Sequence, residues 1–173
     1  MALDTTVLDD TGWRLLHELQ ENARLSYAEL GRRVSLTLPA VAERIRKMED
    51  AGIITGYRAE LNPARIGLPI SAFIRISIVG NVFTRITKVV RELPEVLECH
   101  RSTGADSFIM KVQVRSVEHL ESLIDKLTPF GSTATSIVLS SPVKRRVLTR
   151  AVSAAPLRQR RRVAAGDNKT VRR

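Results

Sequence analysis

The sequence of 173 residues predicts an α+β protein: an N-terminal three-helix helix-turn-helix domain of winged type, followed by a ferredoxin-like βαββαβ domain. Two observations lead to this prediction. Up to residue 50, apolar residues recur at helical spacing. After Pro69, short stretches of alternating apolar and polar residues are separated by two helical stretches. The change of period places a domain boundary close to Pro69.

The first helix is expected over residues 5–22. Its apolar stripe is formed by Trp13, Leu15, Leu16 and Leu19. Asp9 and Asp10 lie near its start, where acidic side chains complement the positive end of the helix dipole.

Two shorter helices, expected within residues 25–34 and 38–50, are separated by a tight turn. Their apolar positions are Tyr27, Leu30 and Val34, and then Val41, Ile45 and Met48. Thr37 is a good N-cap, and its hydroxyl is expected to accept from the first backbone N–H groups. Gly52 suits the left-handed position after a helix. This arrangement predicts a helix-turn-helix motif.

A narrow helix after a sharp turn can enter the major groove of DNA. The candidate DNA-binding residues are Thr37, Pro39, Ala40, Glu43, Arg44 and Lys47. Arg44 and Lys47 are the expected base or phosphate contacts, on a mostly basic face opposite the apolar one. An ordinary helical hairpin with a solvated charged face fits the same spacing. Residues 53–61 are expected to be extended, as a small wing or as a strand that pairs elsewhere.

The second half of the chain has the order strand, helix, strand, strand, helix, strand. The strands are expected at residues 72–78, 96–102, 108–114 and 133–141, and the helices at 86–93 and 117–127. Such an antiparallel sheet carries helices on one face only. The other face is expected to hold Phe73, Leu97, Cys99, Ile109 and Val138. An uncovered apolar face favours dimerisation through the two sheets.

The net charge of +10 lies entirely at the C-terminal end. Residues 1–142 contain 17 basic and 17 acidic side chains, whereas residues 143–173 contain 11 basic side chains and one acid. Residues 147–173 have few large apolar side chains and are expected to be disordered. This tail is interpreted either as an arm that lies along DNA phosphates or as a solvated extension without function.

Signs of catalysis or of cofactor binding are missing from the sequence. The three histidines lie in separate expected elements without the spacing of a metal site, and no phosphate-binding glycine loop is present. Cys99 is the only cysteine, which fits a reducing cytoplasm. No apolar stretch approaches the length of a membrane span. We therefore expect a cytoplasmic, nucleoid-associated protein without enzymatic activity, catalytic residues, metal or cofactor.

Two stretches, residues 24–31 (RLSYAELG) and 41–54 (VAERIRKMEDAGII), resemble the Lrp/AsnC (leucine-responsive or feast-famine) bacterial transcription regulators. The resemblance covers about residues 9–146. In that family the turn before the second of the paired helices usually reads Leu-Ser-Pro, whereas here Pro39 comes one place later. The resemblance implies a C-terminal βαββαβ module that senses amino acids, and dimers that often assemble into octamers.

The resemblance also implies an effector loop between the second and third strands. Its residues here are Thr103, Gly104, Ala105, Asp106 and Ser107, with Thr135 and Ser136 of the last strand nearby. The family's aspartate position holds Ser107, and Asp106 stands one place earlier. A carboxylate there would pair with the ammonium group of an amino acid. An ordinary hairpin turn and exposed strand residues remain the alternatives.

The sequence as a whole indicates a sequence-specific DNA-binding transcriptional regulator, modulated by an amino acid or a related small molecule. Its expected parts are residues 1–61 for DNA binding, 62–69 as linker, 70–146 for effector binding and oligomerisation, and 147–173 as tail. The expected partners are double-stranded DNA, the effector and further copies of the chain, with no membrane. Two alternatives remain: a nucleoid-type architectural protein with little sequence preference, and a regulatory subunit of an enzyme.

Overall fold

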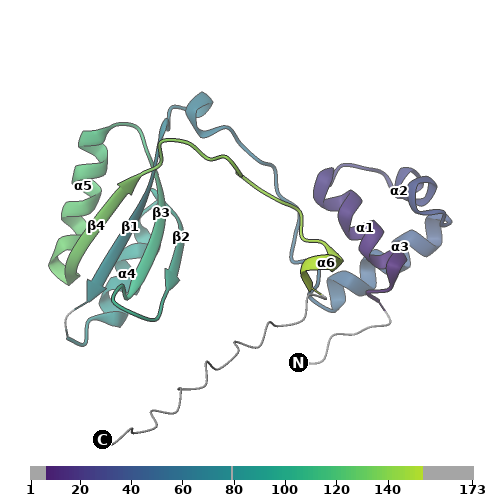
Figure 1. The fold of residues 1–173 in the computed structure, drawn as a ribbon, viewed down its shortest axis with the longest axis horizontal. Helices are drawn as coiled ribbons and strands as arrows, with labels where there is room; N and C mark the ends of the chain where they lie inside the picture. Colours follow the sequence, from purple (N-terminus) through teal and green to yellow (C-terminus); the bar gives the residue numbers. More distant parts are fainter. Residues whose placement is uncertain (1–6, 79, 154–173) are drawn as a thin grey trace, which may run out of the picture. The chain divides into compact units, whose positions relative to one another are not determined.

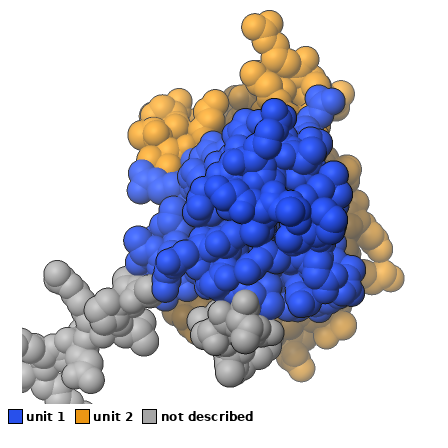
Figure 2. All heavy atoms as spheres, turned by 90° about the vertical axis from the view of Figure 1, so that its right-hand side faces the viewer, with its two compact units in different colours: residues 1–58, 145–173 blue, residues 59–144 orange. Residues whose placement is uncertain are grey.

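The computed structural model describes residues 7–78 and 80–153, which belong to two compact units (Figures 1 and 2). The helical unit consists of residues 1–58 together with 145–173, and the sheet unit of residues 59–144. Among the described residues, no helix is long and apolar enough to cross a membrane.

Three helices form most of the helical unit: α1 (Asp10–Glu21), α2 (Tyr27–Val34) and α3 (Leu38–Asp50). All three were expected, but α1 begins later than predicted. Asp9 stops the helix from starting earlier, because its carboxylate accepts a hydrogen bond from the Gly12 N–H at 2.7 Å and so caps the first turn. Residues 5 and 6 lie outside the described residues.

The core of the helical unit consists of two small apolar clusters. One contains Leu15, Leu19, Leu30, Val34, Val41 and Ile45, and the other contains Val7, Leu16 and Met48. Tyr27, expected in the apolar stripe of α2, is 40% exposed. Burial of these periodic positions fixes the three helices against one another.

The turn between α2 and α3 depends on Ser35 and Gly31. Ser35 ends α2 in the left-handed conformation, with φ 61°. The Leu36 N–H then donates to the Gly31 carbonyl at 2.9 Å. A Cβ on Gly31 would lie 2.5 Å from the Leu36 carbonyl oxygen, so only glycine permits this turn. The tight turn sets the direction in which α3 leaves.

The predicted wing is not formed. Residues 53–62 follow α3 without helix or strand, because no strand of the described residues pairs with them to complete their backbone hydrogen bonds. Instead, the Tyr57 hydroxyl donates to the Glu49 carboxylate at 2.9 Å and holds the segment to the end of α3. Partial burial and the adjacent Glu49 charge raise the pKa of Tyr57 to about 12.

The sheet unit has the predicted order of elements. They are β1 (Ile70–Ile78), α4 (Phe83–Glu92), β2 (Val96–Arg101), β3 (Phe108–Val114), α5 (Val117–Leu127) and β4 (Gly131–Ile137). Short 3₁₀ turns lie at Pro63–Ile66 and Thr128–Phe130. The strands pair antiparallel in the order β2-β3-β1-β4, as the ferredoxin-like arrangement requires.

The last strand lies earlier in the chain than predicted. β4 starts opposite the end of β1, where Gly131 pairs with Ile78. A Cβ at Gly131 would meet the Ser77 carbonyl oxygen at 2.2 Å, so the close approach depends on this glycine. Because Gly131 has no side chain, the alternation of apolar and polar residues did not reveal the start of the strand.

One face of the sheet carries α4 and α5 and contains a single continuous core (Figure 1). Its buried members are Ala72, Ile74, Ile76, Ile86, Val90, Leu93, Phe108, Met110, Val112, Val114, Leu120, Leu123, Leu127 and Phe130. Phe73 lies on the opposite face and is 41% exposed, as expected. Cys99 was placed on the wrong face, since it pairs with the buried Met110 and opposed residues share a face. Val138 follows the end of β4.

The start of the expected tail is ordered against the helical unit. Gln20 of α1 accepts from the Leu148 N–H at 2.8 Å and donates to its carbonyl at 3.0 Å. Arg150 pairs with Asp10 and begins the helical turn α6 (Arg150–Ser153). The prediction of disorder is therefore wrong for residues 147–153, because polar contacts replace the missing apolar ones. Residues 154–173 lie outside the described residues.

Candidate nucleic-acid interface and effector loop

The N-terminal half of α3 is the exposed part of the helix-turn-helix. Thr37 and Pro39 are exposed and Ala40 is half-buried. The predicted cap is not made, because the Thr37 side chain forms no hydrogen bond to the helix and Pro39 has no N–H to offer. The Thr37 hydroxyl and the first N–H groups of α3 are therefore left for an external partner such as a phosphate.

The charged face of α3 is neutral rather than mostly basic. Its sequence contains three basic and three acidic residues. Arg46 donates to Glu43 at 3.0 Å and to Asp50 at 3.1 Å, and the Lys47 ammonium lies 3.5 Å from Glu43. The Arg46 and Lys47 charges lower the pKa of Glu43. Contact with DNA would require these side chains to exchange partners within the helix for groups of the DNA.

Arg44 is placed differently from the prediction. Its guanidinium donates two hydrogen bonds, each 2.9 Å long, to the two carboxylate oxygens of Asp9. Arg44 lies three residues after Val41 and four before Met48, so it flanks the buried face rather than opposing it. The paired guanidinium lowers the pKa of Asp9. Arg44 therefore joins α3 to the start of α1.

The loop between β2 and β3 is held against the end of β1. The Ser77 hydroxyl donates to the Ala105 carbonyl at 2.8 Å and lies 3.5 Å from the Asp106 carboxylate. The Ser102 hydroxyl donates to the Asp106 carbonyl at 2.6 Å. Thr103, Gly104 and Ala105 are exposed, and Asp106 and Ser107 are half-buried. The loop is thus a fixed turn that leaves the Asp106 carboxylate partly open to solvent.

Ser107 has a structural role in this loop. Its hydroxyl accepts from the Ile78 N–H at 3.1 Å, and its own N–H donates to the Ile76 carbonyl at 2.8 Å. Gly104 has φ 105°, a conformation that other residues rarely adopt. The serine therefore supports the loop on β1, and Asp106 is the only carboxylate among residues 103–107.

The two polar residues of the last strand do not share a face. Thr135 pairs with Ile74, and Ser136 pairs with Phe73. Ser136 therefore lies on the open face of the sheet, whereas Thr135 lies at the edge of the face that carries the helices. Only one of the two can face a ligand bound on a given side.

Two contacts that shape these sites were not found from the sequence. Asp9 was expected to stabilise its own helix, and the separation of 35 residues hid its pairing with Arg44. The support of the loop by Ser77 bridges 28 residues. A residue whose partner lies so far away in the chain leaves no local pattern.

Metal and nucleophile chemistry find no support in residues 7–78 and 80–153. No group of three histidine, cysteine or acidic side chains could hold a metal ion there. The His119 Nε2 atom instead lies 2.9 Å from the carboxylate of Glu95, which stands in the turn between α4 and β2. Burial raises the pKa of the Cys99 thiol, which makes it a weaker nucleophile.

A helix-turn-helix unit followed by a ferredoxin-like unit is typical of a DNA-binding protein with a second domain. Two family models match the chain: the AsnC-type helix-turn-helix domain over residues 8–49 and the Lrp/AsnC ligand binding domain over residues 71–148. The chain belongs to the Lrp/AsnC family of transcriptional regulators.

Characterised relatives resemble the chain over most of its length. The transcriptional regulator LrpC of Bacillus subtilis is 33% identical over 77% of this chain and 92% of its own length. Its solved structure has a TM-score of 0.77 and 32% identity, and the match covers 80% of this chain and 99% of that one. The regulatory protein AsnC of Escherichia coli is 32% identical over 84% of this chain and 99% of its own length.

A third relative was solved with a ligand. The structure of a transcriptional regulator from Neisseria meningitidis in complex with L-methionine has a TM-score of 0.77 and 32% identity, with 82% of this chain and 96% of that one covered. Like its relatives, this chain is a DNA-binding transcriptional regulator rather than an enzyme.

Proposed function

We propose that this regulator reads DNA with the exposed face of α3 and the residue before it, using Thr37, Pro39, Ala40, Glu43, Arg44 and Lys47. The observation that supports this assignment is the exposed start of α3 after a turn fixed by Gly31, where no side chain of residues 7–78 or 80–153 caps the first N–H groups. In a dimer, two such helices would contact half-sites about one helical turn of DNA apart.

The six residues have different roles in this proposal. Thr37, Pro39 and Ala40 are small enough to let the helix approach the base edges closely. Lys47 turns from Glu43 to a phosphate or a base, and Glu43 accepts from a cytosine amino group. Arg44 acts from the flank, and its pairing with Asp9 sets how deeply the helix enters the groove.

The basic residues that follow α6 add a contact without sequence preference. Residues 154–173 contain seven basic side chains and one acid. Their charge suits the phosphate backbone, and each phosphate they neutralise would add about 0.9 to the slope of log affinity against log salt. Deletion of residues 154–173 should therefore flatten this slope and weaken binding to all DNA sequences alike.

The DNA proposal can be tested on sequences that the protein itself selects from a random pool. Lys47→Ala should weaken binding to the selected DNA by about 1–3 kcal/mol if Lys47 reads a base. Binding to scrambled DNA should change less. Arg65→Ala, which removes an exposed cation from the sheet unit, is the matched control.

The outcome of the selection also tests the mode of binding. If no sequence is enriched, and affinity for selected and random DNA is equal, the protein is an architectural DNA-binding protein instead. If Lys47→Ala and Arg65→Ala behave alike on enriched DNA, α3 is not the reading helix.

We propose further that residues 103–107 bind an amino acid, with Asp106 holding its ammonium group. Backbone N–H groups of the exposed Thr103, Gly104 and Ala105 would hold the carboxylate, and either Thr135 or Ser136 would border the ligand. The related Neisseria regulator was solved with L-methionine, which makes methionine the first ligand to test.

A thermal-shift series with a panel of amino acids tests the effector proposal. An amino acid that binds the folded protein should raise the melting temperature of the wild type. Asp106→Ala should abolish this rise, while Asp125→Ala, an exposed acid on α5, should retain it. A rise of wild-type size in Asp106→Ala would show that the loop is only a turn.

We propose that homodimers form through the open face of the sheet. We also propose that the protein is located in the cytoplasm, in association with the nucleoid. Phe73 and Ile109 lie on this face. This face also carries Arg75 and Lys111, and its apolar side chains, which no layer of the unit covers, favour pairing with a second copy. Analytical ultracentrifugation of the full chain should show dimers or larger assemblies, and Phe73→Glu should shift the distribution toward monomers.

A further inference from the structure

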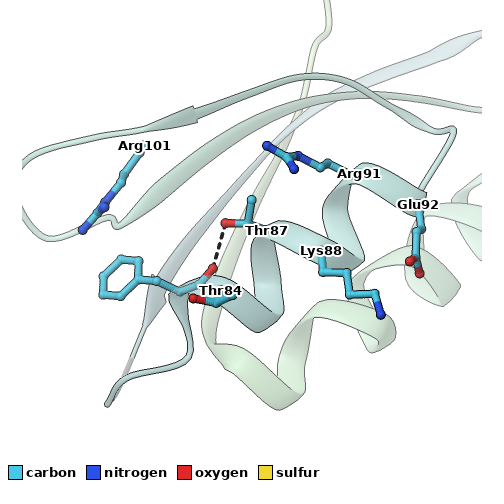
Figure 3. A pocket seen from close by; sticks show the side chains of 7 residues that line it. Thr84, Thr87, Lys88, Arg91, Glu92 and Arg101 are labelled. Atoms are coloured by element: carbon cyan, nitrogen blue, oxygen red, sulfur yellow. Dashed lines mark hydrogen bonds between the residues drawn. The ribbon is translucent and has the colours of Figure 1, made fainter.

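A shallow groove of about 510 Å³ lies between α4 and the end of strand β2, outside residues 103–107 (Figure 3). Its lining consists of Phe83, Thr84, Thr87, Lys88, Arg91, Glu92 and Arg101. The α4 residues recur every three or four positions, so they form one stripe along the helix. Arg101 is the last residue of β2, so two elements contribute to the groove.

The groove collects positive charge that the protein does not neutralise. Lys88, Arg91 and Arg101 form no ion pair with any of the described residues, and Glu92 is the only acid in the lining. In α3, by contrast, Arg44, Arg46 and Lys47 all pair with acids. Unpaired cations that line one groove favour an anionic ligand.

The two arginines come from the two elements that line the groove, Arg91 from α4 and Arg101 from β2. The Arg101 guanidinium lies over the Phe83 ring, 4.2 Å from its centroid, and this contact restrains the long side chain. Figure 3 shows Arg91 extending from α4 toward the strand that carries Arg101. The Thr87 hydroxyl already donates to the Phe83 carbonyl at 2.7 Å, so among the lining hydroxyls only that of Thr84 can still donate.

We propose that this groove binds a small phosphate-bearing molecule, with Arg91 and Arg101 as the phosphate clamp. Arginine suits this role because its planar group can donate two hydrogen bonds to one phosphate. Thr84 donates a further hydrogen bond, and Lys88 adds charge at the rim. The site is separate from the proposed amino-acid site, so the sheet unit would sense two classes of ligand.

The shape of the charge distribution favours a small molecule over the DNA backbone. Glu92 ends the positive stripe after two turns of α4, and its carboxylate would repel a phosphate backbone that continued past it. The volume lies within the range of small-molecule sites. A compact pyrophosphate group matches a clamp of two arginines.

Isothermal titration of the full-length protein with pyrophosphate and with adenosine 5′-diphosphate, in phosphate-free buffer at 0.15 M ionic strength (roughly physiological), tests the proposal. Both probes should bind the wild type. Arg91→Ala and Arg101→Ala should each weaken binding by about tenfold or more, since each removes charged hydrogen bonds. Arg115→Ala, which removes an exposed arginine of the same unit outside the groove, should bind like the wild type.

Arg101→Lys keeps the charge but not the forked donors, so its affinity should fall between those of the wild type and Arg101→Ala. Circular dichroism checks that each variant is folded. If Arg101→Ala does not fold, the comparison of the wild type with Arg101→Lys still tests the role of Arg101. Equal affinity of the wild type, Arg91→Ala and Arg101→Lys would overturn the proposal. Weakened DNA binding in these variants, with unchanged pyrophosphate binding, would also overturn it and assign the groove to DNA.

Discussion

The helical unit and the sheet unit use their charged side chains in different ways. In the helical unit, Arg33 pairs with Glu18 and Glu29, Arg44 with Asp9, and Arg46 with Glu43. In the sheet unit, the cations of the α4 groove have no such partners among residues 7–78 and 80–153. The helical unit has two small apolar clusters, whereas the sheet unit has one large core. These paired arginines of the helical unit therefore have a structural role, and any role in DNA binding would be additional.

The largest difference is expected in the cores. Ile74 and Ile45 are both fully buried, but Ile74 belongs to a cluster of 14 buried residues and Ile45 to a cluster of six. Ile74→Ala should lower the free energy of unfolding by about 4 kcal/mol and Ile45→Ala by about 2 kcal/mol, because a small helical cluster closes more easily around a cavity. Urea denaturation measures both values. A larger loss for Ile45→Ala would reverse the comparison.

A half-buried hydrogen-bonded pair of the sheet unit, Glu95 and His119, gives the next largest effect. The Glu95 side chain is 12% exposed, and His119 is its nearest partner, at 2.9 Å. The other carboxylate oxygen of Glu95 is buried without a hydrogen bond within the described residues. His119→Ala should therefore lower the free energy of unfolding by about 1–3 kcal/mol at neutral pH. Urea denaturation at pH 7 measures the loss, and an unchanged midpoint would show that Glu95 does not depend on His119.

The same pair predicts a pH dependence with a definite sign. The hydrogen bond from His119 lowers the pKa of Glu95 below its ordinary value of 4.5. The stability it contributes is therefore present above pH 4.5 and is lost as the pH falls through the lower, folded-state pKa. Urea midpoints between about pH 3 and 7 should show this loss in the wild type and a shallower one in His119→Ala. Parallel curves would contradict the assignment.

The Asp9–Arg44 pair should have a smaller effect, since both side chains are partly exposed. A double-mutant cycle with Asp9→Ala and Arg44→Ala should give a coupling of about 0.5–1 kcal/mol in the free energy of unfolding. The DNA affinities of the two single variants then separate a structural role of Arg44 from a role in DNA contact. If Arg44 also contacts a base, Arg44→Ala will weaken binding by roughly 1–3 kcal/mol more than Asp9→Ala. Equal losses would make Arg44 a purely structural residue.

The smallest effect is expected at the surface of α3. Arg46 pairs with Glu43 and Asp50 on the fully exposed face of the helix, where solvent screens the interaction. Arg46→Ala should leave the thermal midpoint of the helical unit unchanged within error. A clear drop in a differential scanning calorimetry trace would show that ion pairs, rather than the two apolar clusters, stabilise this unit.

The sequence by itself determined the order of the elements and the family. Helical and alternating periods place α2, α3 and β3 close to their observed bounds, because burial of one face imposes those periods on any chain. The stretches at residues 24–31 and 41–54 pointed to the family that the comparisons confirm. These features are local, so a single sequence contains them.

Only the tertiary structure decided how distant residues meet. The pairing of Arg44 with Asp9 and the support of the loop by Ser77 each join different elements, and the groove residues Arg91 and Arg101 likewise come from α4 and β2. The faces of Thr135 and Cys99 depend on strand register, and a shift of one residue exchanges the two faces of a strand. Register and long-range contacts arise from packing of the whole unit, and no local pattern in the sequence specifies them.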